Sequence, residues 1–321
     1  MNIAITDFNN YGILRHSDEI NAISQWNKNL KEFKFNDTGL CNRLFFLEFI
    51  HFINSKNDYN FNVIVDKNQW LESKYLDISN TNFVDYENIN FSDYIKIDEI
   101  LLNKIINEDF KLDETKNYCT DFKYRTLYDE IDTKESFFIQ NVSIKENISG
   151  YDLKSSIKDN SKDLIGIHLR RGRGVNYTDE DIKSLPESIR DEFLETKLVD
   201  DDARKFYIFD FIQDKVYFDV IDLILEKNPN QKFYVSTDMD LKFISHWVER
   251  YKDKIHTKMN FFLPDALENI HYENVVDLFA LSNTKMLIKF PVSSWSTFAS
   301  LYKEKNSFLI TDDIEKITYQ K

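Results

Sequence analysis

Cysteine, glycine and proline are scarce in this chain of 321 residues, which has 2 Cys, 6 Gly and 4 Pro. The two cysteines, Cys41 and Cys119, cannot form a disulfide framework or a four-cysteine metal site, and this favours a reducing compartment. So few glycines and prolines leave little room for flexible linkers. No apolar run approaches the roughly 18 residues that a membrane-spanning helix needs. Asp7 interrupts the first apolar run too early for a signal peptide. We therefore expect a soluble, cytoplasmic protein.

Positive charge is also in deficit. The chain has 41 Lys and Arg against 55 Asp and Glu, a net charge of −14 at pH 7. A surface of this sign repels nucleic acid and anionic membranes, so we expect neither as a partner. Apolar residues, in contrast, make up 42% of the chain and include 27 Phe and 17 Tyr. Because 321 residues are long for one hydrophobic core, the sequence predicts two domains.

The second half of the chain alternates between strand and helix patterns. Short apolar runs predict strands, and runs with helical periodicity predict helices. The predicted strands are 164–169, 233–238, 286–290 and 308–311, and the predicted helices include 204–226, 273–281 and 295–302. This alternation predicts an α/β fold with a parallel, doubly wound sheet. The polar residues 179–202 predict an inserted excursion or lid.

The first half is less regular. Strand patterns at 3–5 and 61–65 flank an apolar run at 44–53 whose length favours a buried helix. Residues 76–135 are acidic and show no clear period, so we assign no elements there. A polar stretch at 159–163 precedes the strand at 164. We place the domain boundary there, which gives domains of residues 1–158 and 159–321.

Three arginines within four residues follow the strand at 164–169. They are Arg170, Arg171 and Arg173, with Gly172 among them and His168 just before. The carboxyl end of a strand is where α/β sheets bind ligands, and the planar fork of arginine donors suits phosphate oxygens. A solvated basic turn is the alternative. The strand, the histidine and the glycine favour an anion site, for a diphosphate.

Two other strand ends carry polar groups, at 236–238 and 293–298. In a parallel sheet these junctions lie at the same edge as the arginines. Hydroxyls at the start of a helix favour an anion, although helix capping by Ser293 or Ser294 explains them equally well. A nucleoside diphosphate would then place its phosphates on the arginines and its base near Asp238.

These residues resemble a known family. The run His-Leu-Arg-Arg-Gly at 168–172 is similar to the HxRRG motif of the fucosyltransferase superfamily that includes protein O-fucosyltransferases, α1,6-fucosyltransferases and the rhizobial nodulation fucosyltransferase. Residues 39–44 resemble the family's amino-terminal Gly-x-x-Asn-[Gln/Arg] loop. Residues 236–238 and 296–298 correspond, in order, to its base-binding aspartate and its phosphate-binding Ser-Thr-Phe. Arg173 departs from the Asp or Asn that the family often has there, which puts the donor sugar in question.

The resemblance implies a GT-B architecture, with two Rossmann-like domains facing across a cleft. The carboxyl-terminal domain would bind GDP-fucose and the cleft would bind a glycan or glycoconjugate acceptor. Arg170 would be catalytic, binding the β-phosphate and supporting the leaving group. The other donor-binding residues would be Asn42, His168, Arg171, Gly172, Asp238, Ser296, Thr297 and Phe298.

Glycosyl transfer leaves negative charge on the diphosphate, which a divalent metal or fixed cations must stabilise. The arginines supply cations, so we expect an inverting transferase with no metal and no cofactor. The first alternative is a metal-dependent transferase that uses Asp238 and Asp240, which match a DxD motif that arises often by chance among 55 acidic residues. The second is a non-catalytic sugar-nucleotide-binding protein. Asp37 and Glu48 are candidates for the general base, but an exposed helix position explains Glu48 more simply.

Overall fold

The computed structural model describes residues 2–5, 40–57, 62–65, 71–79, 81–85, 94–97, 99–107, 110–113, 115–120, 141–148, 151–171, 175–191, 194, 209–261, 270–291, 293–302 and 306–311. The chain divides into two compact units, Met1–Ile144 and Lys145–Lys321. The boundary predicted between residues 158 and 159 falls inside helix α5 (Leu153–Ser161), which packs on α10 (Ile270–Asn283) of the second unit. The polar residues near this boundary, 159–163, form the end of α5 and the turn that follows it rather than a linker.

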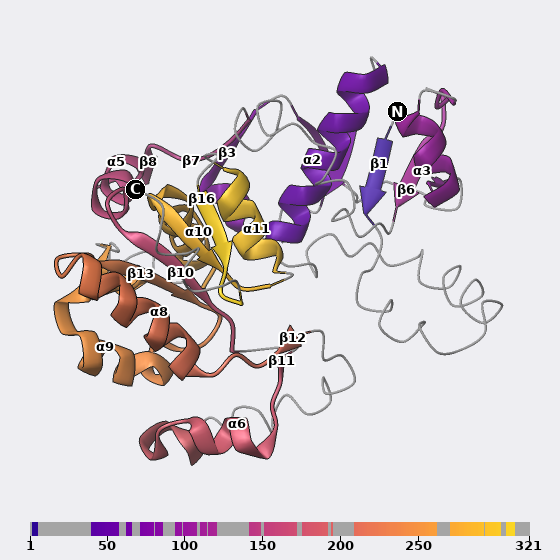
Figure 1. Ribbon diagram of the computed structural model, residues 1–321. Helices are drawn as coiled ribbons and strands as arrows, with labels where there is room; N and C mark the ends of the chain where they lie inside the picture. Colours follow the sequence, from indigo (N-terminus) through magenta and orange to yellow (C-terminus); the bar gives the residue numbers. More distant parts are fainter. Residues whose placement is uncertain are drawn as a thin grey trace. The chain divides into compact units, whose positions relative to one another are not determined.

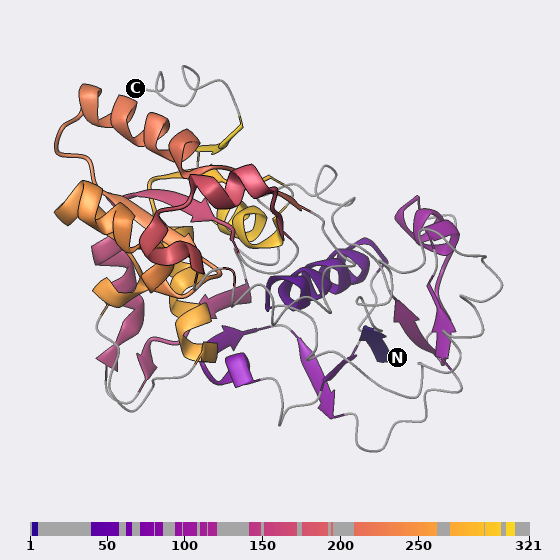
Figure 2. The same ribbon diagram turned by 90° about the horizontal axis from the view of Figure 1, so that it is seen from below.

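The first unit contains a parallel sheet of five strands in the order β4-β2-β1-β6-β5. Its strands are β1 (Asn2–Ile5), β2 (Asn62–Val65), β4 (Asn82–Asp85), β5 (Tyr94–Lys96) and β6 (Asn117–Thr120). The predicted apolar helix becomes α2 (Leu40–Asn57), which lies alongside these strands (Figure 2). The remaining elements are η3 (Leu71–Lys74), α3 (Glu99–Ile106), and an antiparallel pair of β3 (Leu76–Ile78) with β7 (Val142–Ile144).

The second unit contains a parallel sheet in the order β14-β13-β10-β15-β16. Its strands are β10 (Ile165–Leu169), β13 (Phe233–Thr237), β14 (Ile255–His256), β15 (Met286–Lys289) and β16 (Asn306–Leu309). Numbered along the chain, this order is 3-2-1-4-5, that of a doubly wound Rossmann sheet. The predicted α/β class is confirmed, and the two Rossmann-like units that a GT-B fold requires are both present.

Helices cover both faces of this second sheet. The helices α8 (Asp214–Lys227) and α9 (Ser245–Tyr251) lie on one side, and α10 and α11 (Ser294–Leu301) lie on the other (Figure 1). Short 3₁₀ helices complete the connections, namely η9 (Leu241–Ile244), η10 (Lys252–Lys254) and η11 (Lys258–Asn260). An antiparallel pair, β8 (Asn147–Ile148) with β9 (Tyr151–Asp152), precedes α5.

Side chains of the central strand β10 alternate between the two faces of the sheet. Ile165, Ile167 and Leu169 belong to the core that the sheet forms with α8 and α9. Gly166 faces α10, where a Cβ atom would lie 2.7 Å from Thr284 Oγ1 and 2.9 Å from a methyl carbon of Leu281. The glycine therefore permits α10 to approach the sheet closely.

The described part of the predicted excursion, residues 179–191 and 194, belongs to the second unit. Its helix α6 (Asp179–Ser184) starts with a capping box between Thr178 and Asp181. Two further strands, β11 (Val175–Asn176) and β12 (Phe209–Asp210), pair in parallel. A small core of Leu185, Ile189 and Phe243 holds this region. The helix predicted from residue 204 begins only at Asp214, because the preceding described residues form β12 and an irregular segment at 211–213.

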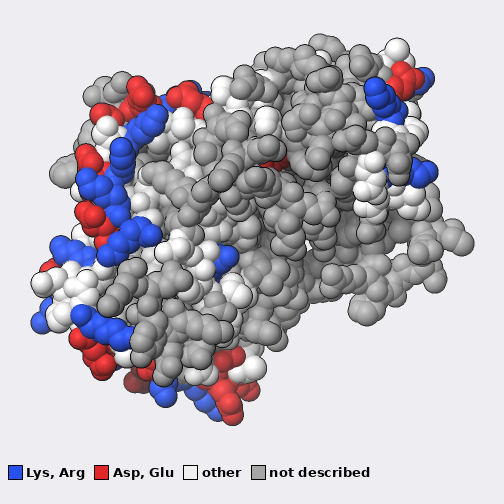
Figure 3. Space-filling model, turned by 45° about the horizontal axis from the view of Figure 1, so that its top comes forward, with Lys and Arg blue, Asp and Glu red and all other residues white. Residues whose placement is uncertain are grey.

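Two surface findings concern the described residues alone. No helix among them is both long enough and apolar enough to cross a membrane. On the face drawn in Figure 3, lysine and arginine side chains are interspersed with aspartate and glutamate. Exposed ion pairs among the described residues include Lys154–Glu146 and Lys162–Asp159.

Candidate functional site

Three of the predicted motifs meet at one edge of the second sheet. The strands β13, β10 and β15 are neighbours, and their register pairs His168 with Ser236. The Phe290 ring, just after β15, lies 6.2 Å from the His168 ring, centre to centre. The connections reverse direction between β10 and β15, and such a switch point is where open α/β sheets bind ligands.

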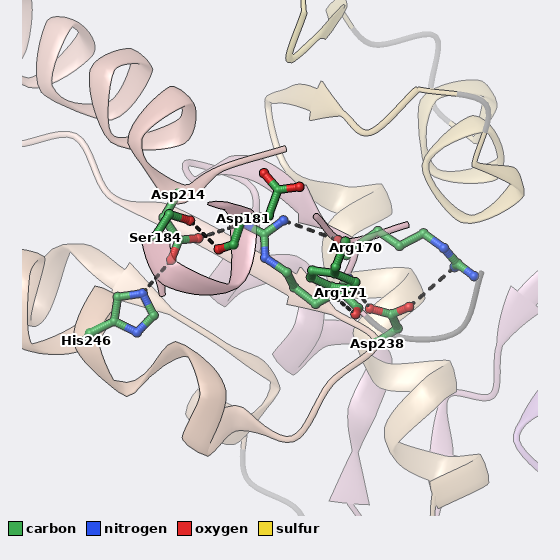
Figure 4. Close-up of polar contacts among 8 residues, drawn as sticks. Arg170, Arg171, Asp181, Ser184, Asp214, Asp238 and His246 are labelled. Carbon is green, nitrogen blue, oxygen red and sulfur yellow. Dashed lines mark hydrogen bonds and ion pairs between the residues drawn. The ribbon is translucent and has the colours of Figure 1, made fainter. Parts of the chain in front are cut away.

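Arg170 follows the central strand and points towards Asp238 (Figure 4). Its Nη1 atom lies 3.6 Å from Oδ2 of Asp238, and the two side chains are 24% and 27% exposed. A partly exposed ion pair at this distance contributes little to stability. A phosphate offers more acceptor oxygens than one carboxylate and can therefore replace Asp238 as the partner of Arg170.

The neighbouring Arg171 points the opposite way and is buried (Figure 4). Its Nη2 atom donates to Oδ1 of Asp214 at 2.6 Å, and its guanidinium lies 4.2 Å from the centre of the Phe211 ring. The second oxygen of Asp214 lies 2.7 Å from Nε2 of His246. Burial acts to raise the pKa of Asp214, but hydrogen bonds from His246 and Arg171 bring it below its usual value. Asp214 thus balances the charge of Arg171 within the protein. The predicted contact of Arg171 with the sugar-nucleotide donor stays a prediction.

The backbone of Arg171 ties the arginine motif to its surroundings. Its N–H donates to Oδ1 of Asp238 at 2.8 Å, and its carbonyl accepts a hydrogen bond from the Tyr177 hydroxyl. Asp238 therefore binds both the backbone of the motif and the guanidinium of Arg170. Its predicted contact with a nucleoside stays a prediction.

The alternative DxD motif has a different local role. Asp240 caps η9 by accepting from the Lys242 backbone N–H at 3.0 Å, while Asp238 holds the arginine motif. Among the described residues, no group of three or more His, Cys, Asp or Glu is arranged to hold a metal ion.

His168 is almost fully buried beneath the site. Burial, and then the charge of Arg170, lower its pKa to about 3, so the ring is neutral at pH 7. Its Nδ1 atom is buried and has no hydrogen-bond partner among the described residues. A neutral imidazole presents one donor and one acceptor. The predicted contact of His168 with a nucleoside stays a prediction.

The hydroxyls at the start of α11 bond to the backbone. The Ser296 hydroxyl donates to the carbonyl of Phe290 at 3.1 Å, and that of Thr297 donates to the carbonyl of Ser293 at 2.8 Å. The first N–H groups of a helix have no carbonyl partner one turn earlier and readily bind anions. We therefore expect backbone amides, more than these two hydroxyls, to donate to a phosphate.

Ser293 is the N-cap residue of α11, but its side chain makes no capping hydrogen bond. Its Oγ atom is buried and has no partner in the part of the chain that the structure describes. Simple helix capping therefore does not account for this hydroxyl. Ser293 is a further polar residue at the switch point, and it is not among the predicted donor-binding residues.

Phe298 lies in the interior rather than at the edge. It is completely buried and contacts the rings of Phe279 and Tyr302, with centres 6.1 Å and 5.8 Å away. The helical turn carries this position into the contact between α11 and α10. The ring has no exposed surface, and its predicted contact with the donor stays a prediction.

A buried carboxylate supports the site and was not predicted. Asp277 of α10 accepts hydrogen bonds from the hydroxyls of Tyr234 at 2.6 Å and Ser236 at 2.5 Å. The Trp295 indole Nε1–H in turn donates to Ser236 Oγ at 3.0 Å. Burial raises the pKa of Asp277 to about 6. The sole sequence signal was a charge inside the apolar run 275–281.

The remaining predicted residues lie elsewhere. Asn42 is in α2 of the first unit, but its side chain is outside the described part, as are Gly172, Arg173 and Asp37. Residues 40–43 form the first turn of α2 rather than a loop, and Arg43 makes a buried ion pair with Glu72 at 2.8 Å. The expectation that Glu48 is exposed was wrong, because this side of α2 is buried as well.

Comparison with solved structures finds fucosyltransferases. The structure of NodZ α-1,6-fucosyltransferase soaked with GDP-fucose has 11% identity and a TM-score of 0.45, and the match covers 82% of this chain and 89% of that one. NodZ from Bradyrhizobium gives 12% identity, a TM-score of 0.45, and coverage of 81% and 88%. POFUT1 in complex with GDP-fucose gives 9%, 0.38, and 85% and 95%. No protein-family model and no curated protein matches the chain.

Proposed function

We propose that this protein is a glycosyltransferase that transfers a sugar from a nucleoside diphosphate to a hydroxyl of a glycan or glycoconjugate. L-fucose from GDP-fucose is the donor that the arginine motif favours. The position of Arg170 carries the proposal. It follows the central strand at the switch point, its guanidinium is partly exposed, and the amino-terminal turn of α11 begins after the neighbouring strand.

The proposed chemistry follows from this placement. The acceptor oxygen attacks the anomeric carbon from the side opposite the diphosphate and loses its proton to a general base, the role for which Asp37 and Glu48 are the sequence candidates. The bond from that carbon to the diphosphate oxygen breaks, and the electron pair remains on the diphosphate. A single displacement of this kind inverts the anomeric configuration. Arg170 and the amides of α11 stabilise the charge that develops on the leaving group, and fixed donors of this kind lower the barrier most.

Fixed cations make a divalent metal unnecessary in this mechanism. The proposal therefore predicts that transfer continues in excess EDTA. Loss of transfer with EDTA and its recovery with Mn²⁺ would instead assign the reaction to Asp238 and Asp240. Nothing in the local roles of these carboxylates favours that alternative.

A nucleotide panel tests the donor. GDP and GDP-fucose should raise the melting temperature more than UDP does, because ligand at about 100 times Kd stabilises the folded state by about 2.7 kcal/mol. A larger shift with UDP would overturn the GDP assignment. Incubation of GDP-fucose with a glycan panel then tests the reaction. Binding of GDP-fucose without transfer or hydrolysis would show a sugar-nucleotide-binding protein.

A further inference from the structure

The chain of hydrogen bonds that runs from the partly buried Trp295 through Ser236 to the buried Asp277 has a fixed direction. An ionised carboxylate only accepts hydrogen bonds, so the Ser236 hydroxyl must be the donor in its bond to Asp277. The Ser236 oxygen can then act as an acceptor, and the Trp295 indole N–H donates a hydrogen bond to it. Asp277 thus sets the polarity of both bonds.

This chain of hydrogen bonds crosses the central strand. Ser236 lies on β13, whereas Trp295 lies in the first turn of α11, which follows β15. The strand β10 lies between β13 and β15 and is followed directly by Arg170. The bond between Trp295 and Ser236 therefore holds the start of α11 across the end of the strand that carries the catalytic candidate.

We propose that Asp277 is a positioning residue that, through Ser236 and Trp295, holds the amino-terminal turn of α11 in the orientation that the donor diphosphate requires. This inference rests on the proposed function, because it assigns that turn to the diphosphate. Asp277 itself is buried and acts through the other two residues. Loss of this connection should weaken binding of the phosphate part of the donor and leave binding of the nucleoside part unchanged.

The carboxylate offers a matched control. Tyr234 and Ser236 each donate one hydrogen bond to Asp277, and only the Ser236 branch leads to α11. Trp295→Phe removes the indole N–H of that branch and keeps an aromatic ring. Tyr234→Phe removes one hydroxyl from the other branch. Each substitution deletes one hydrogen bond, a buried one in Tyr234→Phe and a partly buried one in Trp295→Phe. Because Trp295→Phe also removes part of the indole ring, the melting temperature of each variant is measured beside its affinities.

The experiment measures binding of GDP and of guanosine by calorimetry at pH 8, where Asp277 is ionised. We expect Trp295→Phe to weaken GDP binding about 5- to 10-fold, the effect of one hydrogen bond, and to leave guanosine binding within twofold. Tyr234→Phe should leave both affinities within twofold. Asp277→Asn places an amide donor beside the two hydroxyls and should reproduce the selective loss of GDP affinity. Equal effects of Trp295→Phe and Tyr234→Phe, or equal losses for GDP and guanosine, would overturn the proposal.

Hydrogen exchange separates this inference from the proposed function. Trp295→Phe should speed amide exchange in the first turn of α11, and Tyr234→Phe should not. If the wild-type protein binds no GDP, the proposed function fails, and the inference fails with it as a statement about the diphosphate. Faster exchange in Trp295→Phe would then show only that the hydrogen bond from Trp295 to Ser236 stabilises the first turn of α11. If the wild type binds GDP and exchange is the same in both variants, the inference alone fails.

Discussion

Oδ2 of Asp238 lies 3.6 Å from Nη1 of Arg170, at the ends of neighbouring parallel strands. The other oxygen of the same carboxylate accepts the backbone N–H of Arg171 at 2.8 Å. The catalytic candidate Arg170 is therefore oriented by a residue of opposite charge. Any phosphate that binds Arg170 also meets the negative charge of Asp238.

Removal of that negative charge should strengthen phosphate binding. Asp238→Asn keeps a carbonyl oxygen for the Arg171 N–H but no longer repels an anion. We expect inorganic diphosphate to bind about 3- to 5-fold more tightly at low salt, the effect of one partly exposed charge. Calorimetric titration measures this, and repetition at high salt should reduce the gain. Unchanged diphosphate affinity would contradict the competition. Loss of GDP affinity with tighter diphosphate binding would add the predicted nucleoside contact of Asp238.

Substitution of Arg170 should lower turnover, whereas substitution of Arg171 should lower stability. Arg170→Ala should lower turnover about 10²- to 10³-fold, as for loss of one preorganised donor to a developing oxyanion, with little change in melting temperature. Arg170→Lys keeps the charge without the fork and should rescue little. Arg171→Ala leaves Asp214 buried without its cation and should cost about 3 to 5 kcal/mol of stability.

Arg250→Ala is the control for both arginine variants, because Arg250 is exposed and pairs with Asp222 on the surface. It should change neither turnover nor stability by a measurable amount. Turnover and urea unfolding of all four variants test the assignment. Near-normal turnover of Arg170→Ala, or unfolding of that variant, would make Arg170 structural. A stable Arg171→Ala with selectively lost GDP affinity would restore Arg171 as a donor contact.

Buried His168 should make the protein sensitive to acid. Burial lowers its pKa to about 3 from an unfolded value near 6.5. The neutral ring therefore contributes stability that is complete above about pH 6.5 and decreases as the pH falls towards 3. Between pH 7 and 5 the loss should be on the order of 2 kcal/mol. His168→Gln should remove this part of the slope.

Asp277 contributes in the opposite sense. Its pKa is raised to about 6, so its contribution is complete below the unfolded value near 4 and is lost as the pH rises through 6. The difference between wild type and His168→Gln, measured by urea unfolding at several pH values, isolates the histidine. A difference that does not change with pH would show that the pKa of His168 is the same in the folded and unfolded protein.

The contact of α10 with Gly166 gives a prediction on packing alone. Gly166→Ala puts a methyl group within 2.9 Å of Leu281 and should cost about 1 to 3 kcal/mol. The additional substitution Leu281→Ala opens space beside it. The double variant should therefore lose less stability than the sum of the single variants. Thermal or urea unfolding of the four proteins measures this coupling, and simple additivity would contradict the close approach.

Sequence patterns predict the central strands of the second unit well, because β10 and β13 are buried at every position and are therefore mainly apolar. The polar groups at their ends stand out against these apolar runs. Residues 76–135 show no clear period, because β3 to β6 have only three or four residues each. Patterns also cannot tell where a charged side chain points. Arg170 and Arg171 are adjacent and identical in type, yet only packing around Phe211 and Asp214 separates their roles.

Because side chains of β10 alternate between the two faces of the sheet, its odd-numbered and even-numbered positions should tolerate substitution differently. Odd positions, Ile165, Ile167 and Leu169, need only an apolar side chain of suitable volume, and exchanges among Val, Ile and Leu should be absorbed there. Even positions are restricted, because Gly166 meets Thr284 and Leu281 and His168 lies under the site. A saturation library across this strand should therefore show tolerance that rises and falls with a period of two residues.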